Sequence, residues 1–165
     1  MVLAAEGVVS ATQYLTIEQA QQAVFPGEHF LEVPMRLTDR QKAEIKKRAG
    51  IAVRSPWPRV WRTGTGGFFV VDQVLGKHEF ITYAVGINPD GRVKQVEIME
   101  YRESYGYEIR DEPWRRQFVG KTSEAPLQLD HDINNVSGAT LSCRHITDGV
   151  KKVLVVYDLA LKAPQ

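Results

Sequence analysis

Hydrophobic residues along the chain recur with two different periods, and the period changes near residue 54. Before this point, two stretches have helical spacing, and each begins with a threonine followed three positions later by a glutamine. These pairs are Thr16 with Gln19 and Thr38 with Gln41. Such pairs form capping boxes, in which each side chain satisfies a backbone N–H at a helix start. Pro26-Gly27 and Gly50 mark the predicted helix ends, so residues 1–54 are expected to form an N-terminal helical extension.

After the break at Ser55-Pro56-Trp57-Pro58, apolar and polar residues alternate with a period of two, which is typical of β-strands. The alternating stretches are rich in valine, isoleucine and aromatic residues and cover residues 59–63, 67–75, 80–87 and 92–100. Asn88-Pro89-Asp90-Gly91 is a predicted turn, because proline fixes one torsion angle and glycine adopts a positive one. The pattern predicts an antiparallel meander.

Helical spacing returns near the C-terminus. A short helix is predicted from Asp111 to Phe118, with proline in its first turn. A longer helix is predicted from near Leu141 to about Leu161, and its regularly spaced apolar residues are Ile146, Val150, Val153, Leu154 and Tyr157. The sequence therefore predicts an α+β fold, a twisted antiparallel sheet covered by helices, with residues 55–165 as one domain after the 1–54 extension.

Composition excludes several kinds of function. The net charge of +1 over 165 residues gives no broad basic surface for nucleic acid. Because Cys143 is the single cysteine, an internal disulfide and an all-cysteine metal site are excluded. The two-residue spacing of Cys143 and His145 is not one that metal-ligand pairs usually have. No stretch approaches the ~20 apolar residues of a membrane span. The start, Met1 to Glu6, fits either the remainder of a trimmed signal peptide or an added start.

The most informative motif is Ser137-Gly138-Ala139-Thr140-Leu141-Ser142, a turn of small residues before the last predicted helix. A bare turn lets backbone N–H groups approach a phosphate, and the helix N-terminus adds a partial positive charge. Ser137 and Ser142 offer hydroxyl donors, and Ser142 is also a candidate cap for the helix. The Thr140 hydroxyl lies where a phosphate would lie, so it can form an ester as well as a hydrogen bond. Taken alone, the same residues also describe an ordinary capped helix start.

Two further patterns precede this motif. One runs from Tyr101 to Tyr107, after the last predicted strand, and the other begins in the short helix and runs from Trp114 to Lys121. Together with Ser137–Ser142, they resemble the FMN-binding domain family over roughly residues 67–153. That family includes components of the sodium-translocating NADH:quinone reductase and of the Rnf electron-transport complex. Trp114 and Phe118, one helical turn apart, are expected to pack in the core.

The resemblance implies that FMN is attached to Thr140 through a phosphoester bond. The implied cofactor-binding residues are Ser137, Gly138, Ala139, Leu141, Ser142, Glu103, Ser104, Tyr105 and Gly106, and the last four form a loop on which the flavin ring would lie. The resemblance also implies an extracytoplasmic location and attachment by a separate flavin transferase, which uses FAD and Mg²⁺. The implied partners are redox proteins, such as those of a membrane electron-transport complex.

One departure from the family pattern leaves alternatives open. The family usually has an aspartate six residues before the modified threonine, implied to matter for the transferase, and this chain has Asn134. A flavin-free binding or assembly module of a membrane redox complex is therefore the alternative to a covalent electron carrier. A substrate-specific oxidoreductase with noncovalent FMN is a third possibility. No acid–base dyad or nucleophile triad is recognisable, so a carrier without catalytic residues or a metal is expected.

Overall fold

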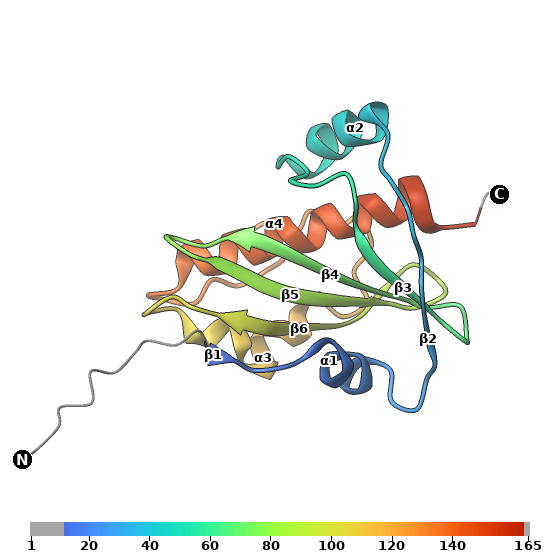
Figure 1. Cartoon of the computed structure of the whole chain (residues 1–165). Coiled ribbons are helices and arrows are strands. Elements are labelled where there is room, and N and C mark those ends of the chain that lie inside the picture. The colour runs from blue at the N-terminus through green and yellow to red at the C-terminus, as the bar shows by residue number, and fades with distance from the viewer. Residues whose placement is uncertain (1–11, 164–165) are drawn as a thin grey trace, which may run out of the picture.

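The computed structural model describes residues 12–163, and an antiparallel sheet forms its centre (Figure 1). The strands lie in the order β1-β6-β5-β4-β3-β2. Their bounds are Thr12–Gln13 (β1), Phe30–Glu32 (β2), Arg59–Thr63 (β3), Phe68–Leu75 (β4), Phe80–Ile87 (β5) and Val93–Tyr101 (β6). Strands β3 to β6 form the meander that the alternation predicts, and the predicted α+β class is confirmed.

The predicted turn between β5 and β6 is also confirmed. Gly91 has a φ of 85°, and its N–H donates to the carbonyl oxygen of Asn88 at 2.8 Å. Only glycine adopts such a φ without steric cost, so the turn residue identified in the sequence is the one that the backbone requires.

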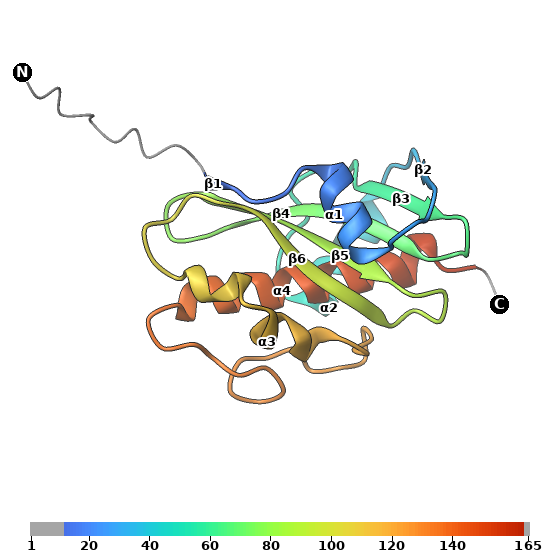
Figure 2. The same ribbon diagram turned by 90° about the horizontal axis from the view of Figure 1, so that it is seen from below.

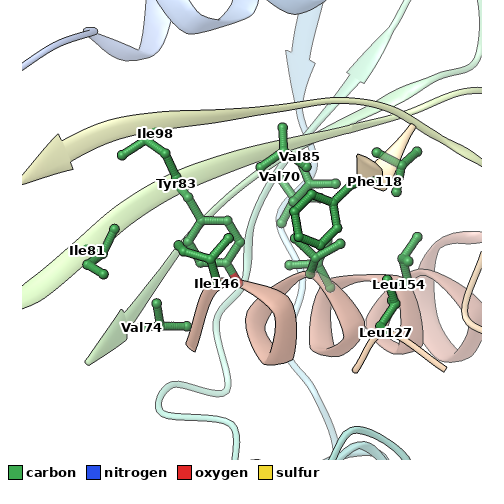
Figure 3. Packing of buried hydrophobic residues seen from close by; sticks show 14 of the residues in the cluster. Val70, Val74, Ile81, Tyr83, Val85, Ile98, Phe118, Leu127, Ile146 and Leu154 are labelled. Carbon is green, nitrogen blue, oxygen red and sulfur yellow. The ribbon is translucent and has the colours of Figure 1, made fainter. Parts of the chain in front are cut away.

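The long C-terminal helix, α4 (Thr140–Val156), lies along one face of the sheet and ends in a π-helical turn, Tyr157–Leu161 (Figures 1 and 2). Its apolar side packs against alternate residues of β4, β5 and β6, as Figure 3 shows for Ile146 beside Tyr83. Gly149 allows this close approach, because a Cβ there would collide with the Tyr83 hydroxyl. The predicted packing face of the helix is thus confirmed.

The N-terminal segment contains both predicted helices, α1 (Ile17–Val24) and α2 (Asp39–Ala49). Both capping boxes are present; the Thr16 hydroxyl oxygen accepts from the Gln19 N–H at 3.1 Å, and the Thr38 oxygen accepts from the Gln41 N–H at 3.1 Å. Helix α1 covers the face of the sheet opposite α4, and α2 packs against α4 (Figures 1 and 2).

The same N-terminal segment supplies both edge strands, β1 and β2, which the sequence pattern did not predict. They are two and three residues long, so their conformation depends on pairing with β6 and β3 rather than on a local alternation. The proposed domain boundary at residue 54 stays a prediction.

Between β6 and α4 the chain forms a 3₁₀ helix (Tyr107–Arg110), helix α3 (Glu112–Arg115), a second 3₁₀ helix (Arg116–Phe118) and an irregular segment, residues 119–139. Trp114 and Phe118 are buried with ring centroids 5.2 Å apart, which confirms their expected role in the core. Within residues 12–163, no helix is both long enough and apolar enough to cross a membrane.

Candidate functional site

The β4–β5 hairpin, the end of β6 and the start of α4 meet at one end of the sheet (Figure 1). Residues of these segments line a cleft of about 530 Å³. This volume falls within the ~300–1,000 Å³ that is common for small-molecule and cofactor pockets. The lining residues are Lys77, His78, Tyr101, Glu103, Ser104, Tyr105, Gly138, Ala139, Thr140, Leu141 and Ser142. Three segments that are distant in the sequence therefore form one site.

Thr140 is the first residue of α4 and is exposed in this cleft. The residue at the N-cap position is Ala139, and no side chain of the described residues caps the helix there. The first N–H groups of a helix have no intrahelical partner, and the helix dipole places about half a positive charge at this end. The uncapped start of α4 thus offers N–H donors to an anion, beside an exposed hydroxyl group.

Ser142 does not cap the helix, which corrects that expectation. It is buried in the first turn of α4, and its Oγ lies 2.9 Å from the Tyr101 hydroxyl oxygen. The Tyr101 hydroxyl in turn donates to the carbonyl oxygen of Tyr105. Burial raises the pKa of Tyr101, although the hydrogen bond with Ser142 opposes this shift. The hydroxyl of Ser142 therefore joins the loop after β6 to the start of α4.

Gly106 makes this junction possible. Its φ is 87°, and a Cβ at this position would lie 2.6 Å from the Tyr101 hydroxyl oxygen and 3.0 Å from Ser142 Oγ. Both the backbone conformation and the available space therefore require glycine. Gly106 is buried and does not line the cleft, so its predicted contact with a flavin ring stays a prediction.

Glu103 stabilises the side of the cleft that the β4–β5 turn forms. One of its carboxylate oxygens accepts from the backbone N–H groups of His78 at 2.5 Å and Glu79 at 2.9 Å. Partial burial opposes ionisation of Glu103, but these backbone hydrogen bonds outweigh it and lower the pKa of the carboxyl group. Glu103 thereby ties the β4–β5 turn to the loop after β6 and places Lys77 and His78 on the cleft wall.

The segment that forms the cleft matches a known protein family. Residues 76–155 match the family model of the FMN-binding domain. This segment belongs to the FMN-binding domain family. It begins in the β4–β5 turn and includes nearly all of α4, so it contains every residue that lines the cleft. No curated protein matches the chain.

The residues of the FMN-binding domain fit the phosphate end of FMN. The uncapped start of α4 presents N–H donors, and Gly138, with a φ of 85°, has no atom within 4 Å of where its Cβ would be. The backbone before Thr140 is therefore open to close approach by an anion. When FMN is bound, it supplies one- and two-electron redox chemistry, and the protein supplies its binding and orientation.

The structure brings most of the predicted site residues together. Eight of them line the cleft, namely Glu103, Ser104, Tyr105, Gly138, Ala139, Thr140, Leu141 and Ser142. Tyr105 and Leu141 are 81% and 43% exposed, so they offer apolar surface to a ring at the site. Ser137 is exposed beside the cleft but does not line it, and its predicted phosphate contact stays a prediction.

Asn135 is a site residue that the sequence pattern did not predict. Its Nδ2 donates to the Thr140 hydroxyl oxygen at 3.0 Å, while its Oδ1 is buried without a partner among the described residues. The preceding Asn134 is held by its backbone, because its N–H donates to Gln117 Oε1 at 2.8 Å and its carbonyl accepts from Trp114 Nε1 at 2.8 Å. The i, i+5 spacing of Asn135 and Thr140 gives no regular signal, because the intervening turn is irregular.

Lys77 and His78 were also missed. They lie in the turn between two predicted strands, where a polar pair is ordinary, and only the contact with Glu103 brings them to the cleft. Lys121, the last residue of the Trp114–Lys121 pattern, pairs with Asp132 at 3.3 Å and lies outside the cleft lining. Cys143 is buried in the core, and burial raises the pKa of its thiol.

Proposed function

We propose that this FMN-binding domain carries FMN covalently on Thr140 through a phosphoester bond and acts as an electron carrier outside the cytoplasm. The observation that supports this most directly is the position of Thr140. Its hydroxyl group is exposed on the first residue of an uncapped helix, within a cleft of cofactor size. A phosphate on this oxygen would lie next to the first N–H groups of α4, which interact favourably with negative charge.

Attachment requires a phosphoryl donor, and we propose FAD. The Thr140 oxygen bonds to the phosphorus atom of the FMN half, the phosphoanhydride bond breaks, AMP leaves, and the hydroxyl proton is released to solvent. A separate flavin transferase with Mg²⁺ catalyses this step. The chain's own contribution is to expose the hydroxyl group and to accommodate the charge of the product.

Two polar side chains that line the cleft already make structural hydrogen bonds. Glu103 is engaged with backbone N–H groups, and the Tyr101 hydroxyl is engaged with Tyr105 and Ser142. Tyr105 and Leu141 present exposed apolar surface on which a flavin ring can lie. These features favour our proposal of an electron carrier for redox proteins, such as those of a membrane electron-transport complex, over turnover of a dedicated substrate.

Intact mass after denaturation tests the proposal. The protein is co-expressed with an extracytoplasmic flavin transferase, and its tryptic peptides are mapped. We expect a mass gain of one FMN less one water on the peptide that contains Thr140, and no gain in Thr140→Ala. Wild-type protein that remains unmodified beside an active transferase, or Thr140→Ala that is still modified, would contradict the proposal.

A second candidate function follows from Asn134, which replaces the usual aspartate of the family and whose side chain is exposed. If the transferase does not accept asparagine there, the domain is a flavin-free binding or assembly module. Such a protein stays colourless after co-expression. Noncovalent FMN is distinguished from both, because it gives a yellow protein that loses its flavin in acid.

A further inference from the structure

The side chain of Asn135 contacts the Thr140 hydroxyl oxygen, the atom to which we propose that FMN is attached. Asn135 precedes the Ser137–Thr140 turn, yet its Nδ2 lies 3.0 Å from the Thr140 hydroxyl oxygen, because the turn folds back on itself. One of the bonds that closes the turn runs from the Ala139 N–H to the Val136 carbonyl oxygen at 3.0 Å. The carboxamide is half-buried, whereas Thr140 is exposed, so Asn135 lies on the protein side of the hydroxyl group.

The other end of the same carboxamide is unsatisfied. Asn135 Oδ1 is buried and accepts no hydrogen bond from residues 12–163. A buried acceptor without a donor is unfavourable, and most such atoms in proteins are paired. The contact with Thr140 is the hydrogen bond that the Asn135 side chain makes within the described residues, so no other partner fixes the orientation of its amide.

A carboxamide matches both chemical states of the Thr140 oxygen. The free hydroxyl group donates one hydrogen bond and accepts others, whereas an ester oxygen only accepts. A carboxamide offers Oδ1 to the hydroxyl proton and Nδ2–H to an ester or phosphate oxygen, and a rotation of the amide exchanges the two. An aspartate of the same shape can only accept and would repel a phosphate. A serine or an alanine is too short to reach.

We propose that Asn135 is a positioning residue that holds the Thr140 oxygen for flavin attachment and then hydrogen-bonds to the attached group. It is not a catalytic base, because a neutral amide does not take up the hydroxyl proton. This inference rests on the proposed function, since it assigns a partner to the same threonine. It depends on Asn135 alone and does not involve Asn134, whose backbone is held by Gln117 and Trp114.

Attachment kinetics with purified flavin transferase, FAD and Mg²⁺ test the inference. Loss of one neutral hydrogen bond predicts that Asn135→Ala lowers the kcat of attachment by about three- to tenfold. The KM for the protein should not change, because positioning acts on the reacting oxygen rather than on docking. Asn135→Asp should be at least as slow. The matched control is Gln128→Ala, which removes an exposed carboxamide from the same irregular segment and should react like the wild type.

An unmodified sample supplies a second readout that needs no transferase. Three-bond NMR couplings to the Thr140 γ-methyl carbon should report one χ1 rotamer in the wild type and averaging in Asn135→Ala, with equal thermal stability in both. Wild-type protein that cannot be modified would overturn the proposed function and this inference together. Wild-type protein that is modified, with Asn135→Ala or Asn135→Asp reacting equally fast, would overturn only the role of Asn135.

Discussion

The substitution Gly106→Ala tests how the cleft is assembled. Gly106 has a φ of 87°, and its Cβ would lie 2.6 Å from the Tyr101 hydroxyl oxygen and 3.0 Å from Ser142 Oγ. An L-residue in the left-handed region costs about 1–2 kcal/mol. Inserting a methyl group into a packed contact costs a further ~1–3 kcal/mol. We therefore expect Gly106→Ala to lower the free energy of unfolding by about 2–5 kcal/mol.

Gly120→Ala is the matched control for this measurement. Gly120 has a similar φ of 82°, but no atom lies within 4 Å of its Cβ position, so only the backbone cost remains. Urea denaturation of both variants should give a difference of about 1–3 kcal/mol, which measures the overlap with Tyr101 and Ser142. In a Tyr101→Phe background, which lacks one overlapping oxygen, Gly106→Ala should cost less stability than it does in the wild type. Equal destabilisation by the two alanines would refute the reasoning, because it would show that the crowding at Gly106 has no energetic consequence.

Three further predictions concern the motif, the hairpin and the core. Asn134→Asp should increase the rate of flavin attachment, measured by mass spectrometry, because it restores the usual residue of the family; an unchanged rate would show that this position does not limit recognition. Glu103→Gln should destabilise the protein more at pH 7 than at pH 3 in urea titrations. The hydrogen bonds from His78 and Glu79 lower the pKa of Glu103 in the folded state, so its stabilisation is present above the unfolded pKa of about 4.3 and is lost as the pH falls through the lower folded value. A difference that does not depend on pH would exclude this role of the carboxylate. Ile146→Ala should lower the free energy of unfolding by about 2–5 kcal/mol, because Ile146 is fully buried between α4 and the sheet; a loss below about 1 kcal/mol would mean that the packing there is loose.

The parts of the fold that sequence reasoning predicted depend on short-range patterns. The capping boxes at Thr16 and Thr38 involve residues three positions apart, and the turn at Gly91 depends on one residue's backbone. The apolar face of α4 is likewise a property of one segment. Such features are visible in a sequence because the interacting residues are close together along the chain.

The missed features depend on contacts between distant segments. Strands β1 and β2 exist only through pairing with β6 and β3. Ser142 looked like a helix cap, but the Tyr101 hydroxyl competes for it from 41 residues away. Lys77 and His78 reach the cleft because Glu103 binds the backbone of their turn. The motif around Thr140 was recognisable by family resemblance, whereas its surroundings required the structure.

Thr140 is also the first residue of a 17-residue helix whose inner side is buried along most of its length. A cofactor attached there would be joined through one side chain to a helix that packs along the sheet. Such a cofactor would move with the whole domain, unlike a group on a long lysine arm. Electron exchange would then depend on how partner proteins approach this one end of the sheet, and its rate would depend on docking geometry more than on motion of the cofactor.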